Sequence, residues 1–167
     1  MKTKQLAINA MLAAMCAVLG YISLDLGNFK FTFESFPILL AALMFGPVSG
    51  MAVAAVGTFI YQLLKWGLMS TTILWILPYV IFALFVGLLY KKDLSKPKFF
   101  ALIIGAGILL TLLNTLGIYI DSKVWGYYTF AYVFGTFFTR LIVSIVKSFV
   151  FAMILPGIIK AVHNAVR

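Results

Sequence analysis

The sequence is poor in charged residues, and acidic residues are the scarcest. Only 10% of its 167 residues are charged, with four acidic against 13 basic side chains, whereas a soluble domain carries about a quarter. Because 64% of the residues are hydrophobic, the chain cannot form a water-soluble surface of the usual kind. The sequence therefore predicts an integral membrane protein, and its length suits a single domain over residues 1–167.

The hydrophobic stretches lack the alternation of polar and apolar residues that is typical of membrane β-barrels. They are long and continuous, which favours helices, because backbone groups in lipid need partners within their own segment. The expected fold class is therefore an all-α membrane protein. The single cysteine, Cys16, excludes an internal disulfide.

Residues needed for several kinds of chemistry are also missing. The sequence has no Walker A pattern, no cluster of His and Cys that could bind a metal, and no Ser-His-Asp set, since His163 is its one histidine. No Asp or Glu is expected in the middle of a membrane span, so a proton or sodium relay lacks its usual carboxylate. The sequence thus predicts neither an enzyme nor a cofactor or metal, and uptake would need energy from another subunit.

Six transmembrane helices are predicted from the apolar stretches. They cover residues 4–22, 33–45, 48–64, 71–90, 99–118 and 127–162, with a polar segment at 23–34 and a linker at 91–98. Basic residues cluster before the first helix, in the linker and after the last helix, so the positive-inside rule predicts that both termini are cytoplasmic. This topology, rather than nucleic-acid binding, explains the net charge of +9. A signal peptide is the alternative for the first helix, but its cleavage site is missing.

Polar and aromatic residues share one face on each of four predicted helices, and the predicted topology puts these faces in the outer half of the membrane. Polar side chains that face lipid are costly, so we expect them to turn inward. The inner halves are mostly apolar, which favours a cup open to the outside over a channel. The candidate substrate-binding residues are Glu34, Gln62, Trp75, Tyr79, Asn114, Tyr128, Tyr132 and Arg140.

The chemistry of this set favours a planar, polar and mostly neutral heterocycle. Trp75 and the tyrosines can stack on a ring. Gln62 and Asn114 can each donate and accept hydrogen bonds, as recognition of ring nitrogens and exocyclic groups requires. Arg140 can pair with an anionic group or cap helix carbonyls.

Structural roles are the alternative for several of these residues. Trp125, Tyr127 and Tyr128 are also typical of the aromatic belts at membrane interfaces. Arg140 can bridge helix ends, and Lys147 can extend its ammonium group to the inner membrane surface.

Small residues form a second candidate surface on the first helix. They are Ala7, Ala10, Ala14 and Ala17, which share one stripe and include an A-x-x-x-A motif. Small residues let helices approach closely in lipid, either within the protein or with a partner.

Three of these features resemble the S components of energy-coupling factor (ECF) transporters. They are the short second helix, the turn FGPVSG at residues 45–50, and the A-x-x-x-A motif of Ala10 and Ala14. The resemblance covers the whole chain, and residues 27–37 and 113–116 are similar to the folate-type branch, which includes carriers for pyridoxine and hydroxymethylpyrimidine. Folate-type carriers often have an arginine soon after the first helix. Residues 21–25 contain none, which favours the smaller rings over folate.

The resemblance implies a subunit of the bacterial plasma membrane that binds a vitamin with high affinity on its outer side. It implies that the alanine stripe docks onto a transmembrane coupling protein with two ATPase subunits, and that the whole subunit topples to deliver the vitamin. Two other functions remain open. A ligand-free assembly protein predicts that Trp75, Tyr79 and Asn114 tolerate alanine, and a stand-alone facilitator predicts uptake without ATP.

Overall fold

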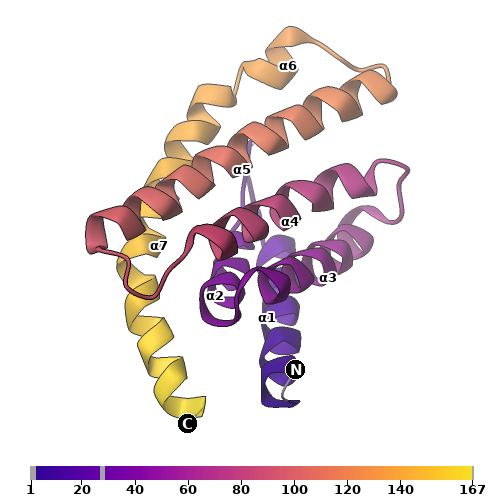
Figure 1. Cartoon of the computed structure of the whole chain (residues 1–167). Helices are drawn as coiled ribbons and strands as arrows, with labels where there is room; N and C mark the ends of the chain where they lie inside the picture. Colours follow the sequence, from indigo (N-terminus) through magenta and orange to yellow (C-terminus); the bar gives the residue numbers. More distant parts are fainter. Residues whose placement is uncertain (1–2, 27–28, 167) are drawn as a thin grey trace.

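Helices account for most of the chain in the computed structural model, which describes residues 3–26 and 29–166 (Figure 1). The predicted helical fold class is confirmed. In chain order the elements are α1 (Thr3–Tyr21), β1 (Leu24–Leu26), β2 (Phe29–Phe31), α2 (Ser35–Phe45), α3 (Pro47–Trp66), α4 (Thr72–Leu89), α5 (Lys96–Val124), α6 (Phe130–Phe134) and α7 (Phe137–Val166).

Five helical stretches among the described residues are long and apolar enough to cross a membrane. They are α1, α3, α4, α5 and the stretch Phe130–Val162, which contains α6 and most of α7. The helix α2 has 11 residues, which span about 16 Å of a hydrocarbon layer that is about 30 Å thick. The chain is therefore a membrane protein, and α2 is too short to cross the layer alone.

Two short strands occupy part of the predicted polar segment at 23–34. β1 and β2 pair in an antiparallel hairpin between α1 and α2. The sequence contained a signal for this hairpin, because two apolar–polar–apolar runs flank Gly27 and Asn28. The runs were too short to be recognised as strands beside six long helices.

The prediction of one continuous helix over residues 127–162 was wrong, because α6 and α7 are separate. The hydroxyl of Thr129 caps the start of α6 by accepting a hydrogen bond from the N–H of Tyr132, at 3.2 Å. At its end, the N–H of Gly135 donates to the carbonyl of Ala131, at 2.9 Å. The Thr129 cap fixes where α6 begins, and the helix ends after 5 residues.

The helix α5 is longer than predicted, since it continues past residue 118 to Val124. The prediction ended where about 20 residues had crossed the membrane. The following polar residues remain helical, and the Ser122 hydroxyl donates to the carbonyl of Tyr119 at 2.9 Å. The helix is therefore longer than a crossing of the hydrocarbon layer requires.

The helices form two sets that we call the α1–α4 group and the α5–α7 arm. Within the group, α3 packs against α1, α2 and α4; within the arm, α5 packs against α7 (Figure 1). The two sets meet where α4 contacts α5 and where α2 contacts α7. The apolar core is centred on α2, in which every residue from 37 to 43 is buried.

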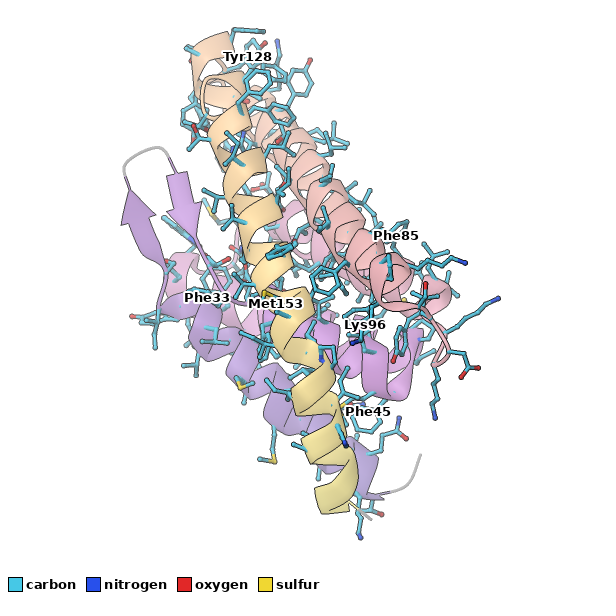
Figure 2. All side chains as sticks on the ribbon, turned by 90° about the vertical axis from the view of Figure 1, so that its left-hand side faces the viewer. Phe33, Phe45, Phe85, Lys96, Tyr128 and Met153 are labelled. Atoms are coloured by element: carbon cyan, nitrogen blue, oxygen red, sulfur yellow. The ribbon has the colours of Figure 1, made fainter. Side chains whose placement is uncertain are left out.

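The two ends of the molecule contain different parts of the chain: both termini lie at one end, and the link between α5 and α6 lies at the other. The start of α1 and the end of α7 lie at the same, lower end in Figure 1. Tyr128, in the link between α5 and α6, lies at the upper end in Figure 2, and Phe45 lies toward the lower end.

Candidate functional site

Four residues from three parts of the chain form a buried group that we call the central polar cluster. They are Thr32, Glu34, Tyr79 and Lys147. Glu34 directly precedes α2 and is 3% exposed, and its carboxylate accepts hydrogen bonds from the Tyr79 hydroxyl on α4 and from the Thr32 hydroxyl, the latter at 3.1 Å. A carboxylate held inside a helical bundle is costly unless it has such donors. The structure thus brings together two predicted site residues, Glu34 and Tyr79.

Lys147 on α7 completes the cluster and corrects a prediction. Its Nζ donates to the backbone carbonyl of Thr32 at 3.2 Å, so it points to the centre of the protein rather than to the inner membrane surface. Glu34 and Lys147 both contact Thr32, so the carboxylate lies near the ammonium group, and opposite charges that are close offset part of the cost of burying each other. The sequence contained a signal for this, because Lys147 continues the polar stripe of Arg140 and Ser144 along the same helix.

Lysines also hold both ends of the β1–β2 hairpin. Lys65 at the end of α3 donates to the hydroxyl of Ser23, which precedes β1, at 2.7 Å. Lys147 binds Thr32, which follows β2. The hairpin is therefore attached to the α1–α4 group at its start and to the α5–α7 arm at its end.

The predicted inward face of α3 is confirmed. Thr58, Tyr61 and Gln62 are all buried, with Gln62 8% exposed. On α4, Trp75 is half-buried one turn before Tyr79. Gln62 and Trp75 thus lie on helices that surround the central polar cluster, and contact with a ligand remains a prediction for both.

Asn114 is half-buried on α5, and its Oδ1 has no hydrogen-bond partner among the residues that the structure describes. Its neighbours differ from it, because the hydroxyls of Thr111 and Thr115 donate to carbonyls of their own helix at 3.0 and 2.8 Å. A buried amide oxygen without a donor is unfavourable. Asn114 therefore offers an acceptor that a ligand can satisfy.

Arg140 has the structural role that was the alternative to ligand binding, because it bridges helix ends. Its Nη2 donates at 2.8 Å to the carbonyl of Val133, in the last turn of α6. The last carbonyls of a helix lack partners within the helix. Arg140 thus stabilises the break between α6 and α7.

Tyr128 and Tyr132 belong to a different group, which we call the aromatic end cluster. Its members come from the end of α5, the following link and α6: Tyr119, Asp121, Lys123, Tyr127, Tyr128 and Tyr132. Tyr128 stacks edge-on against Tyr119, with ring centroids 5.5 Å apart, and the Nζ of Lys123 lies 4.1 Å from its ring centroid. Figure 2 shows Tyr128 at the upper end of the molecule, whereas Phe33, next to Glu34 in the sequence, lies farther down. The predicted binding residues therefore divide between two places.

Tyr127 and Asp121 form the polar contact of the aromatic end cluster. The Tyr127 hydroxyl donates to the carboxylate of Asp121, which is 7% exposed. Partial burial and this hydrogen bond raise the pKa of Tyr127 above its ordinary value of about 10. Tyr127 and Trp125 are largely exposed, as the aromatic-belt alternative predicts.

An apolar groove of about 370 Å³ lies between α5 and the last two helices. Its lining residues are Leu112, Thr115, Leu116, Tyr119, Phe134 and Phe137. The groove lacks the donors and acceptors that a polar heterocycle requires. In addition, the described residues contain no group of three His, Cys, Asp or Glu side chains that could hold a metal.

The alanine stripe of α1 is only partly available to a partner. Ala7, Ala10 and Ala14 are exposed, together with Met11. Ala17 is 5% exposed and packs inside the protein, so its assignment to a docking surface was wrong. Ala17 lies at the edge of the alanine stripe, so it faces the same side of the helix as the buried Cys16.

Comparisons with known proteins agree on the nature of this fold. A solved structure described as the S component of a bacterial ECF transporter is 24% identical in sequence, with a TM-score of 0.74 over 100% of this chain and 99% of that chain. A structure of FolT bound with folic acid is 22% identical, with a TM-score of 0.64 over 92% of this chain and 89% of that chain. At these identities the likeness shows the fold. No curated protein sequence matches the chain significantly.

A family-level comparison identifies the kind of protein. The sequence pattern of the family described as "ECF transporter, substrate-specific component" matches residues 4–166. Members of this family select the substrate of a transporter and are not enzymes. Because the match covers almost the whole chain, this protein belongs to the substrate-specific components of ECF transporters.

Proposed function

We propose that this chain binds a small ring vitamin or vitamin precursor, of the hydroxymethylpyrimidine or pyridoxine class, at the central polar cluster. The observation that carries this proposal is the buried carboxylate of Glu34, which accepts hydrogen bonds from the hydroxyls of Thr32 and Tyr79 and shares Thr32 with the ammonium group of Lys147. Ionisable groups kept inside a membrane protein are rare and usually functional.

The chemistry of Glu34 suits both proposed ligands. A carboxylate can accept one N–H from the amino group of an aminopyrimidine, and a second, parallel one when the adjacent ring nitrogen is protonated, or one from a pyridinium nitrogen. Trp75 and Tyr79 on α4 offer ring faces for stacking, and Gln62 and Asn114 are further proposed contacts. Tyr128, Tyr132 and Arg140 contribute from the arm, where the aromatic rings can cover the ligand and Arg140 supports the backbone.

We further propose that the chain is one membrane domain with six crossings, of which α2 makes the short one. Both termini then lie in the cytoplasm of a bacterial cell, and the ligand enters from outside. This topology is supported by the start of α1 and the end of α7, which lie at the same end of the molecule (Figure 1), and by the basic linker at residues 91–98.

The energy for uptake comes, in this proposal, from a transmembrane coupling protein with two ATPase subunits. The exposed alanines Ala7, Ala10 and Ala14 form the docking surface, since small side chains allow close helix contact in lipid. Toppling of the whole subunit on the coupling protein then delivers the ligand inward.

Folate is the second candidate ligand. It is favoured by the likeness of the fold to FolT, whose structure contains folic acid. The aminopyrimidine edge of its pteridine ring can bind Glu34 in the same way as the smaller ring. Its carboxylates would then pair with Lys123 or Arg140 in the arm.

The test begins with mass spectrometry of the purified, heat-denatured protein to identify a co-purified small molecule. Calorimetric titration of the emptied protein in nanodiscs then measures its affinity for pyridoxine, hydroxymethylpyrimidine and folic acid. We expect Glu34→Gln to weaken binding of the preferred compound at least tenfold, because the carboxylate accepts charge-assisted hydrogen bonds.

The matched control is Asp93→Asn, which removes an exposed carboxylate from the linker at residues 91–98 and leaves the central polar cluster intact. It should bind a small ring with wild-type affinity. A pteridine in the mass spectrum would move the assignment to folate. A wild-type protein that binds none of the three compounds would contradict the proposed function.

A further inference from the structure

We propose that the apolar groove between α5 and the last two helices binds an acyl chain of an anionic phospholipid, whose phosphate binds Lys123 at the end of the groove. The partner belongs to the membrane leaflet next to the α5–α6 link. This inference goes beyond vitamin binding, because the groove and the central polar cluster lie on different sides of α5.

The groove opens away from α4 and the helices behind it. A Cβ added at Gly117 would lie 3.3 Å from the carbonyl oxygen of Leu74, so this side of α5 faces α4. The groove residues Leu112 and Leu116 lie on another side of the helix and are exposed. In a membrane protein, an exposed apolar groove of this kind is open to lipid. A lipid chain can therefore enter it without reaching the central polar cluster.

The lining of the groove suits hydrocarbon. The hydroxyl of Thr115 donates to the carbonyl of Thr111 at 2.8 Å, so it needs no partner in the groove. Phe134 and Phe137 line the opposite side. Tyr119 lies where the lining comes nearest to the end of α5, and tyrosine is typical of positions at the level of the lipid headgroups. An acyl chain can fill the groove without leaving the Thr115 hydroxyl unpaired.

Lys123 continues the face of α5 that lines the groove. Leu112, Leu116, Tyr119 and Lys123 follow one another at spacings of four, three and four residues, so they share one face of the helix. The Nζ of Lys123 lies 5.9 Å from the ring centroid of Tyr119. Because a helix rises about 1.5 Å per residue, Lys123 lies about 16 Å along the axis from Leu112. The hydrocarbon of one leaflet is about 15 Å thick, so a lipid held at Lys123 can lay its chain along the groove.

The ammonium group of Lys123 can attract an anionic headgroup. Its Nζ lies 4.1 Å from the ring centroid of Tyr128, and the side chain is exposed. A ring face attracts a cation but does not neutralise its charge. The carboxylate of Asp121, close in the sequence, is buried and accepts from the Tyr127 hydroxyl. The end of the groove therefore favours an anionic headgroup over a zwitterionic one.

The experiment separates the contribution of the headgroup from that of the chain. Native mass spectrometry of the full chain in detergent measures the affinity for the first bound lipid, either dioleoylphosphatidylglycerol (anionic) or dioleoylphosphatidylcholine (zwitterionic). We expect the wild type to bind the anionic lipid about three- to tenfold more tightly, which is the effect of one lysine near a membrane surface. Lys123→Gln should lose this preference. Leu116→Trp, which fills the groove, should weaken the binding of both lipids.

Two matched variants act as controls. Lys160→Gln removes an exposed lysine from α7, and Leu88→Trp enlarges an exposed leucine of α4. Both should bind the two lipids as the wild type does. If Leu116→Trp does not fold, Leu112→Trp fills the same groove from another exposed position.

Four outcomes would overturn the inference. The wild type could bind the two lipids equally, or Lys123→Gln could keep the preference, which would assign it to another basic surface. Leu116→Trp could bind both lipids as tightly as the wild type. A dimer in the mass spectrum that Leu116→Trp abolishes would make the groove an interface between two copies of the chain. No vitamin is present in these measurements, so each of these outcomes leaves the proposed function standing.

Discussion

The α1–α4 group and the α5–α7 arm are held together by different kinds of contact. In the group, glycines bring backbones together: a Cβ added at Gly57 would lie 2.6 Å from the Cβ of Cys16, and one added at Gly50 would lie 2.7 Å from the Cβ of Ala42. In the arm, α5 and α7 also approach closely at Gly107, whose carbonyl accepts from the Ser144 hydroxyl at 2.8 Å, but the upper contacts are between aromatic rings, such as Tyr119 and Tyr128. Close backbone contact cannot adjust, whereas ring contacts can.

This difference suggests that the group and the arm have different roles at the site. The rigid group holds Glu34 and Tyr79 at the central polar cluster. The arm supplies Lys147, and it meets the group between α4 and α5 and between α2 and α7, where the rings of Phe36 and Phe151 lie 5.2 Å apart. We expect substitutions at the close backbone contacts of the group to affect folding most, and substitutions of site residues in either part to affect ligand binding.

The largest expected effect comes from enlarging a glycine of the group. Gly57→Leu would force a side chain against Cys16 and against the backbone carbonyl of Ala13, 2.9 Å from the new Cβ. We expect a loss of at least about 3 kcal/mol, because overpacking against backbone cannot be relieved by a rotamer change. A thiol-reactive dye measures this directly, since Cys16 is the single cysteine and is buried.

Gly105→Leu is the matched control in the arm. No atom lies within 4 Å of a Cβ at Gly105, and leucine favours a helix more than glycine does. Its unfolding temperature should equal or exceed that of the wild type. If both variants unfolded at the same temperature, the proposed difference between group and arm would be wrong.

The next effect concerns the exposed side of the group, where α1 faces away from the site. Ala10→Trp/Ala14→Trp should abolish vitamin uptake in cells that contain the coupling protein and ATPases, because bulky side chains prevent close helix contact. Vitamin binding by the isolated chain should not change. Normal uptake by this variant would show that α1 is not the docking surface.

Much of the fold could be predicted because hydrophobic length and membrane thickness restrict helices strongly. The predicted range 4–22 agrees with α1 to within one residue at each end. The prediction failed where local chemistry decides instead. The start of α6 depends on a threonine cap, and the β1–β2 hairpin depends on two three-residue runs, neither of which changes the average hydrophobicity.

The site was predicted less completely, because helix periodicity shows which face turns inward but not which faces meet. The polar faces of α3 and α5 are buried as expected, and Glu34 and Tyr79 do meet. Periodicity could not reveal that Lys147 reaches Thr32, a contact between residues 115 positions apart. It also could not show that Tyr128 and Tyr132 belong to a separate cluster at the end of the molecule.

A smaller effect compares two buried amides, one in each part. Asn114 in the arm and Asn9 in the group both have buried side-chain oxygens without hydrogen-bond partners among the described residues. We expect Asn114→Ala to weaken vitamin binding about two- to tenfold in calorimetric titration, since the ligand would satisfy its amide. Asn9→Ala should leave binding unchanged and raise the unfolding temperature, because it removes a buried amide that gains nothing from the ligand. If the two substitutions changed binding equally, the assignment of Asn114 to the site would be contradicted.

The smallest effect separates the aromatic end cluster from the rest of the arm. Tyr127 donates to Asp121 only while its hydroxyl is protonated, and its pKa in the folded protein is raised. The stabilisation is therefore complete below the unfolded pKa of about 10 and is lost as the pH rises toward the higher folded value. At pH 8, Tyr127→Phe should lower stability by about 1 kcal/mol or less, since the pair is partly exposed. Unfolding temperatures measured from pH 7 to 11 should show this difference from the wild type shrinking above pH 10.

The exposed Tyr21 provides the control, because Tyr21→Phe should behave like the wild type throughout. A difference between Tyr127→Phe and the wild type that did not change with pH would mean that ring packing, and not the bond to Asp121, holds this end of the arm together.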